Sequence, residues 1–366
     1  MTPMHPGFSV YLDLVRVAAA LVVYLTHSQL IVDDKVFLGA YGHSAVVVFF
    51  VLSGYVVAFV TDQKEKDWRT YAASRLSRVY SVVIPAIVIT LVADAIGRAH
   101  DPELYKYPWD QFAVRTVAAL AMLNEFWFIA ITPFSNVPYW SIAYESWFYL
   151  VFAVITFAPA PWRWWLAGGL LLIVGPKIAI LFPLWLAGVA LYRWRSLQVE
   201  RLAVAIALVA VSWVGIIGLH LGGFFDHTYG LTKRLLGDWL FVQMAFSKFA
   251  IGDYVLAVLV VANFAGMRRL APLFEPLAHA MAKPVAAVAG VSFTLYLTHQ
   301  PLLLMWATLL DIDRGAWSGW WAVAALVGLS VWLTAQITEK RRGALRKAIA
   351  RVLRRIGRDP SARLPA

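Results

Sequence analysis

The chain has 366 residues, of which 61% are hydrophobic and only 14% are charged, and its mean hydropathy is +0.69. Soluble domains average about 45–50% apolar and 25% charged residues, so this composition excludes an ordinary soluble fold and indicates several membrane spans. The chain has no cysteine, which excludes disulfides, thiolate metal sites and a cysteine nucleophile. Of the net charge of +11, +8 lies from Glu339 onward, where ten basic residues stand against two acidic ones. This local concentration argues against nucleic acid as a partner.

A spanning helix needs about 20 mostly apolar residues. In chain order, the segments that meet this requirement are 8–31, 44–60, 79–96, 139–157, 202–221, 249–264, 285–309 and 317–337. The range 162–194 is too long for one span and is interrupted by a Gly-Pro pair at 175–176. The range 112–131 is apolar but carries three polar groups. The pattern predicts an all-α integral membrane protein.

Basic residues concentrate in cytoplasmic loops. Here they follow the second span, flank residue 200, form a pair at 268–269 and fill the C-terminal tail. With both termini in the cytoplasm, ten transmembrane helices fit these clusters in two ways. In the first, 162–194 forms two spans and 112–131 enters from outside as a re-entrant segment; in the second, each range crosses once. We favour the first, because polar groups suit a segment that does not cross.

Residues 1–338 are expected to form a single transmembrane domain whose first helix is retained rather than removed as a signal peptide. Residues 339–366 are expected to form a basic amphipathic cytoplasmic tail. Its apolar residues, on one helical face, are Leu345, Ile349, Val352, Leu353 and Ile356. This pattern is typical of a helix on the anionic membrane surface, and we assign it no chemistry.

The first span contains Asp13, Arg16 and His27, and a charge inside a span costs several kcal/mol. Arg16 and His27 are eleven residues apart, which places them on one helix face about 16 Å apart along the axis. With a cytoplasmic N-terminus, Arg16 lies in the cytoplasmic half and His27 towards the outside. Asp13 lies one turn from Arg16 and is expected to pair with it. The alternative is that Arg16 extends to the interface and His27 caps the helix.

In the span 139–157, Ser141, Glu145 and Tyr149 recur every four residues and share a face. Glu145 lies inside an apolar helix and needs a cationic partner. Its distance from the helix start suggests a depth similar to that of His27, where the carboxylate would orient the imidazole and stabilise its charged form. The alternative is a structural ion pair between helices.

Arg75 and Arg78 share a helix face at the cytoplasmic start of the third span. Arginine pairs bind phosphates in a bidentate manner, which indicates a phosphorylated cytoplasmic ligand; the alternative is a topology signal. His299 lies mid-helix before Pro301, where it lines the same interior or has a structural role.

Five segments in this order resemble the acyltransferase 3 family of membrane-bound acyltransferases. They are LDLVRVAAALVVYLTH, VVVFFVLSGYVVA, RLSRVYSVVIPA, VPYWSIAYESWFYL and VSFTLYLTHQPLL, and they extend from residue 12 to about residue 303. The resemblance implies ten membrane helices and transfer of an acyl group, commonly acetyl, from cytoplasmic acyl-CoA. The acceptors it implies are hydroxyls of cell-surface or exported carbohydrates and lipids.

The family's Arg-x10-His pair falls on Arg16 and His27, its Arg-x-x-Arg motif on Arg75 and Arg78, and the glutamate of its Trp-Ser-Leu-x-x-Glu motif on Glu145. Ile142 stands where leucine is usual. Some members carry an additional helix and a fused SGNH hydrolase-like domain, and we expect neither within these 366 residues.

These observations predict an acyl-CoA-dependent acyltransferase in a bacterial cytoplasmic (inner) membrane. We expect His27 and Glu145 to be catalytic. His27 would act as the general base or carry the acyl group itself, and Glu145 would be its partner. The expected donor-binding residues are Arg16, Arg75 and Arg78, and the expected substrate-binding residues are Asp13, Ser141, Tyr149 and His299. The expected partners are acetyl-CoA or another acyl-CoA, a carbohydrate or lipid-linked glycan acceptor, and membrane lipids; no metal or nucleic acid is expected, and self-association is left open.

The competing function is a proton-coupled secondary transporter or glycan flippase, in which the same intramembrane charges form a proton relay. That function leaves the arginine pair at the cytoplasmic side and the five family segments unexplained.

Overall fold

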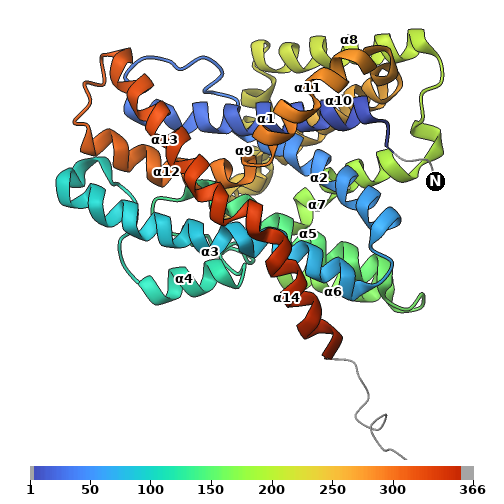
Figure 1. Cartoon of the computed structure of the whole chain (residues 1–366), viewed down its shortest axis with the longest axis horizontal. Coiled ribbons are helices and arrows are strands. Elements are labelled where there is room, and N and C mark those ends of the chain that lie inside the picture. The colour runs from blue at the N-terminus through green and yellow to red at the C-terminus, as the bar shows by residue number, and fades with distance from the viewer. Residues whose placement is uncertain (1–3, 356–366) are drawn as a thin grey trace, which may run out of the picture.

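In a computed structural model of the chain, the structure describes residues 4–355, and these form helices and no strand (Figure 1). The prediction of an all-α protein is confirmed. The helices are α1 (Pro6–Ser28), α2 (Gly42–Lys64), α3 (Trp68–His100), α4 (Phe112–Leu120), α5 (Trp140–Phe157), α6 (Arg163–Val174), α7 (Pro176–Arg193), α8 (Leu202–Leu221), α9 (Phe224–Gln243), α10 (Ala250–Leu270), α11 (Glu275–Ala289), α12 (Ser292–Leu309), α13 (Trp317–Ile337) and α14 (Arg342–Arg355).

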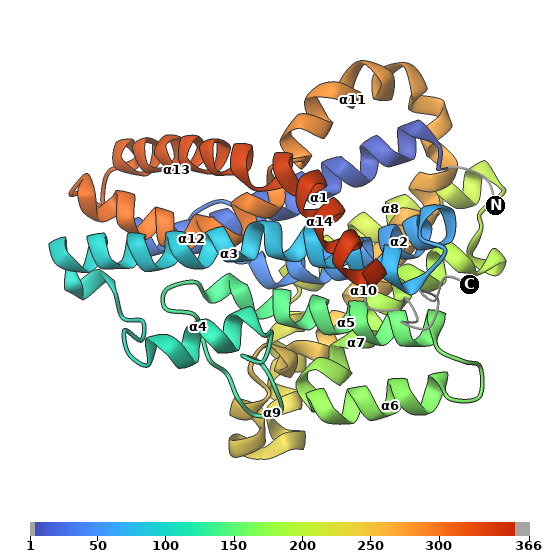
Figure 2. The same ribbon diagram turned by 60° about the horizontal axis from the view of Figure 1, so that its bottom comes forward.

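Eight helical segments of the described chain are long and apolar enough to cross a membrane. The protein is therefore a multi-pass membrane protein, while ten crossings and cytoplasmic termini stay predictions. α12 packs against both α1 and α3, with α2 against α1 and α13 against α12 (Figure 2).

The range 162–194 forms two helices, and that each of them crosses the membrane, as in the favoured topology, stays a prediction. They meet at Gly175, whose φ of 90° is accessible to glycine and strained for other residues, and Pro176 then begins α7. α6 has only 12 residues and is not among the eight segments long enough to cross a membrane.

The range 112–131 forms the nine-residue helix α4 and then irregular chain. Nine residues rise about 13.5 Å, too little to cross a bilayer. Its Glu125 accepts a 2.7 Å hydrogen bond from Lys177 of α7, which also donates to the carbonyl of Ile129. Arg115 of the segment donates to Asp110 and to the carbonyl of Thr132, so both of its charged groups have protein partners, as a segment at membrane depth requires, whereas the buried Asn124 side chain has none among the described residues.

Two predicted boundaries are wrong. The range 285–309, expected as one span, contains the end of α11 and all of α12, because Gly290 caps α11 and Val291 is not helical. α3 begins at Trp68 instead of residue 79, because Asp67 caps its N-terminus by accepting from the backbone of Arg69 and Thr70. Hydrogen bonds from the side chain and backbone of Thr70 lower the pKa of Asp67.

The close approach of α2 and α7 depends on two glycines. A Cβ on Gly54 would lie 1.9 Å from the carbonyl oxygen of Trp185, and one on Gly188 would lie 1.9 Å from that of Val51. Only residues without a side chain allow the two backbones to come this near.

Replacing Gly54 with alanine is expected to destabilise the protein by about 3 kcal/mol, because backbone on both sides has to move. Thermal unfolding in detergent and the folded yield measure the effect. Gly168 of α6 is the matched control, since a Cβ there would meet no atom within 4 Å. Equal melting temperatures for the two alanine variants would contradict this description of the α2–α7 contact.

α14 crosses the middle of α3 in both views (Figures 1 and 2). The predicted tail thus begins as a helix that packs on the transmembrane bundle rather than only on lipid. The remaining predicted tail residues, 356–366, which include Ile356, lie outside the described residues.

Candidate functional site

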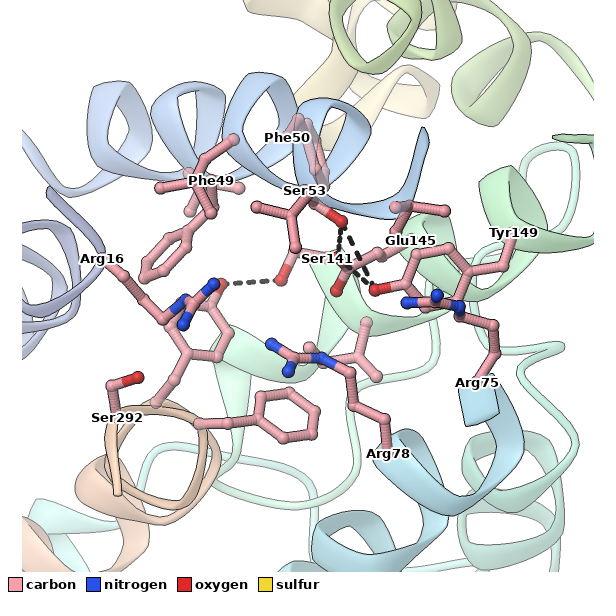
Figure 3. A pocket seen from close by; sticks show the side chains of 17 residues that line it. Arg16, Phe49, Phe50, Ser53, Arg75, Arg78, Ser141, Glu145, Tyr149 and Ser292 are labelled. Atoms are coloured by element: carbon pink, nitrogen blue, oxygen red, sulfur yellow. Dashed lines mark hydrogen bonds between the residues drawn. The ribbon is translucent and has the colours of Figure 1, made fainter. Parts of the chain in front are cut away.

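Five helices, α1, α2, α3, α5 and α12, surround a cavity that we call the central pocket (Figure 3). Its polar lining residues are Arg16, Ser53, Arg75, Arg78, Ser141, Glu145, Tyr149, Ser292 and Tyr296. Six of these were expected as site residues from the sequence, and they come from three helices far apart in the chain. The structure therefore brings together the first-span arginine, the arginine pair and the Ser141–Glu145–Tyr149 face.

Glu145 lies in a hydrogen-bond network on one wall of the central pocket. The hydroxyls of Ser53 and Tyr149 both donate to its Oε1, the latter over 2.6 Å. The indole of Trp185 donates to Ser53 Oγ over 3.2 Å. The other carboxylate oxygen, Oε2, has no hydrogen bond to the described residues, and Glu145 lines the pocket together with Arg16 and Arg78. This arrangement holds a negative charge in place opposite two guanidinium groups.

Arg75 and Arg78 differ in their surroundings. Arg75 donates over 2.7 Å to Glu65, whose side chain is fully buried and also accepts from Thr61. The same guanidinium lies over the rings of Tyr71 and Tyr149. Arg75 therefore already has a buried counter-ion within the protein.

Arg78 lies over the ring of Phe293 and has no ion pair within 4 Å in the described chain. Arg16 is paired with Asp13 over 2.8 Å, as the sequence predicted. Arg16, Arg78, Ser292 and Phe293 also line a second cavity, which we call the basic vestibule. Its other polar and charged lining residues are Asp13, Ser81, Glu339 and Arg342. Asp13 lies in this vestibule and not in the central pocket.

Tyr296 forms the end wall of the central pocket. Its hydroxyl lies 2.6 Å from Ser141 Oγ, and its ring packs edge-on against Phe49. On its other side the ring contacts that of His299. Tyr296 therefore links the lining of the central pocket to a histidine pair.

The pair consists of His27 and His299, with 3.1 Å between His27 Nδ1 and His299 Nε2. His299 is fully buried, and its Nδ1 lies 3.0 Å from the carbonyl oxygen of Leu295. A carbonyl only accepts, so in the neutral ring Nδ1 of His299 carries the proton and Nε2 is an acceptor. His27 Nδ1 lies 2.9 Å from the carbonyl of Val23, so it too carries the proton. The free lone pair of neutral His27 is therefore on Nε2. A general base or nucleophile needs such a lone pair.

The expected contact between Glu145 and His27 is not present, because the depth assigned to Glu145 from the sequence is wrong. α1 and α2 run antiparallel, with Thr26 against Gly42. From this contact, ten residues along α1 reach Arg16 and eleven along α2 reach Ser53, so that Arg16 and Ser53, the partner of Glu145, lie at about the same depth. Glu145 thus lies at the depth of Arg16, and His27 is about 16 Å further along α1.

Several residues of the site were missed from the sequence. Glu65 gives no signal, because it lies ten residues before Arg75 in a loop. Ser53 gives no signal either, because its contact with Glu145 depends on how α2 meets α5. Tyr296 could have been found, because it lies three residues before His299 and so shares its helix face.

A family model described as an acyltransferase domain, that of the acyltransferase 3 family, matches residues 9–339. Searches among curated proteins and among solved structures returned no match. The matched range covers most of the 366 residues and contains the central pocket, the basic vestibule's α1, α3 and α12 residues, and the histidine pair. The chain therefore belongs to the acyltransferase 3 family and is a membrane acyltransferase.

Proposed function

We propose that the protein transfers an acetyl or other acyl group from cytoplasmic acyl-CoA to a hydroxyl of a cell-surface or exported carbohydrate or lipid-linked glycan. The observation that carries this proposal is the pair of adjacent cavities lined by Arg16 and Arg78, together with His27 about 16 Å further along α1, whose Nε2 has no hydrogen bond to residues 4–355. The arginines suit the phosphates of the donor, and the apolar walls of the central pocket suit its pantetheine arm. The proposed setting is a bacterial cytoplasmic membrane.

His27 has the chemistry that the transfer requires. In direct transfer, Nε2 accepts the proton of the acceptor hydroxyl, the alkoxide forms the new C–O bond, and the thioester C–S bond breaks. The proton then passes from the imidazolium to the leaving thiolate. In the covalent route, Nε2 itself attacks the thioester and the acceptor alcohol then displaces the imidazole. Both routes need the lone pair that the contacts of Nδ1 leave on Nε2.

Glu145 acts in this proposal on the arginine side of the site. With Ser53 and Tyr149 bound to Oε1, the carboxylate partly neutralises Arg16 and Arg78 and keeps their side chains directed into the central pocket. Ser141 and Tyr149 line the path of the donor arm. Asp13 orients Arg16 in the vestibule.

Purified protein in lipid bilayers, incubated with acetyl-labelled acetyl-CoA, tests the proposal. We expect saturable acetyl-CoA binding, and label transferred to a glycan fraction from the native membrane. An acid-labile acetyl adduct on His27 that forms before acceptor is added would support the covalent route. Absence of acetyl-CoA binding, together with movement of a glycan across proteoliposomes, would overturn the proposal in favour of transport.

His299 is expected to be a positioning residue, because its Nε2 is a second acceptor, beside the carbonyl of Val23, for the one Nδ1–H of His27. Replacing His299 with leucine removes this acceptor and is expected to lower kcat by roughly tenfold or more. This is part of the 10²–10⁴-fold rate enhancement that a general base typically contributes. KM for acyl-CoA is expected to stay unchanged, because His299 does not line the central pocket or the vestibule.

His299→Gln, which retains an acceptor oxygen, is the matched variant and is expected to recover part of the lost kcat. Steady-state kinetics with both variants check this. Equal losses in the leucine and glutamine variants, or a rise in KM with constant kcat, would contradict the positioning role.

A further inference from the structure

The C-terminal helix contributes to the basic vestibule. Arg342, the first residue of α14, lines this cavity together with residues of α1, α3, α11 and α12. The segment that leads into α14 is fixed to α12 by Thr338, which is buried and whose hydroxyl lies 2.9 Å from that of Thr294. Arg342 follows four residues later, where α14 begins to cross α3.

The charges of the vestibule leave Arg342 without a counter-ion. The cavity is lined by three arginines and two carboxylates. Asp13 is paired with Arg16, and Glu339 lies within electrostatic range of Arg78. Within residues 4–355, the side chain of Arg342 makes no hydrogen bond and no ion pair.

The neighbours of Arg342 increase this positive potential. Arg78, Arg75 and Arg346 all lie within electrostatic range of its guanidinium. Arg346 is four residues further along α14 and so lies on the same helix face. Like charges this near repel one another unless an anion lies between them.

We propose that Arg342 binds a phosphate of the acyl-CoA donor, together with Arg78, so that the C-terminal helix completes the donor site. This inference rests on the proposed function, whose arginines come from α1 and α3 alone. The proposal gives the C-terminal helix a role in ligand binding, whereas its basic residues alone indicate only the membrane topology. The arginine fork suits a phosphate because it offers several N–H donors in one plane.

The test uses Arg342→Ala in the full-length protein, reconstituted in bilayers of phosphatidylcholine alone. Acetyl transfer is measured with acetyl-CoA, with acetyl-dephospho-CoA and with acetyl-pantetheine, which carries no phosphate. The KM for acetyl-CoA is expected to rise about tenfold or more, which corresponds to the loss of one charge-assisted hydrogen bond of about 1.5–3 kcal/mol. The KM for acetyl-pantetheine is expected to equal that of the wild type.

Arg351→Ala is the matched control. Nine residues beyond Arg342 place Arg351 on the opposite face of the helix, and its side chain is exposed. Its KM for every donor is expected to be that of the wild type. Arg342→Lys, which keeps the charge, is expected to fall between the alanine variant and the wild type.

The donor series separates the outcomes. A defect seen with acetyl-CoA but not with acetyl-dephospho-CoA assigns Arg342 to the 3′-phosphate, and a defect with both assigns it to the diphosphate; each supports the proposal. Equal losses with acetyl-CoA and acetyl-pantetheine would mean a structural role and overturn it. So would a defect that appears only in phosphatidylglycerol bilayers, because Arg342 would then bind a lipid headgroup. Wild-type protein that neither binds nor uses acetyl-CoA would overturn the proposed function itself.

Discussion

Replacing His27 with alanine is expected to lower the rate of acyl transfer by about 10²- to 10⁴-fold, the contribution typical of a general base. The reason is that Nδ1 is engaged by the carbonyl of Val23 and by His299, which leaves the lone pair on Nε2. Acyl-CoA binding is expected to be retained, because His27 lies outside both arginine-lined cavities. Single-turnover transfer and equilibrium binding of acetyl-CoA measure the two properties separately.

The matched control for this prediction is His227→Ala. His227 is an exposed histidine of α9 whose Nδ1 lies 2.8 Å from the carbonyl of Gly223, the same local geometry as in His27. This variant is expected to transfer at the wild-type rate. If His27→Ala also turned over at that rate, or if it lost acyl-CoA binding in parallel with turnover, His27 would have no chemical role in transfer.

Replacing Arg75 with alanine is expected to destabilise the protein by about 3–5 kcal/mol, because it leaves the fully buried carboxylate of Glu65 without its counter-ion. The remaining hydrogen bond from Thr61 is too weak to compensate. A lower melting temperature in detergent, measured without acyl-CoA, is the expected result. The double variant Glu65→Gln/Arg75→Ala is expected to recover much of the loss, since no buried charge is then unpaired.

Arg78→Ala is the comparison that separates stability from donor binding. Arg78 has no ion pair within 4 Å in the described residues, so its loss is expected to raise the KM for acyl-CoA with a smaller change in melting temperature. If Arg75→Ala melted at the wild-type temperature and only its KM rose, Arg75 would be a donor ligand equivalent to Arg78. The sequence alone treats the two arginines as such a pair.

The sequence by itself determined the helical membrane fold and most of the residues of the site. Long apolar segments in lipid have to form helices, because the backbone cannot satisfy its hydrogen bonds with water there. The motif spacings placed Arg16 and His27 on one face of α1 and Ser141, Glu145 and Tyr149 on one face of α5, and all but His27 line the central pocket or its rim. These properties depend on helix periodicity and are local in the chain.

Only the tertiary structure decided which of these residues meet. Glu145 contacts Ser53 and lies level with Arg16 instead of with His27, because depth depends on where each helix enters the bundle and on its tilt. His27 meets His299, which is 272 residues away. Such contacts follow from side-chain packing between helices. The periodicity of a single sequence shows which residues share a helix face, but not which faces of different helices meet.

The same distinction applies to the arginines and to the C-terminal helix. Composition marks Arg75, Arg78 and Arg342 alike as basic residues near the end of a span, which the charge bias of cytoplasmic loops explains equally well. Packing gives Arg75 a buried counter-ion in Glu65, directs Arg78 towards both cavities, and places Arg342 in the vestibule without a partner in the described chain. Electrostatic energy falls steeply with distance and with exposure to water, so the role of each charge depends on its nearest counter-ion. Which counter-ion is nearest depends on the tertiary fold, because the two residues can lie far apart in the chain.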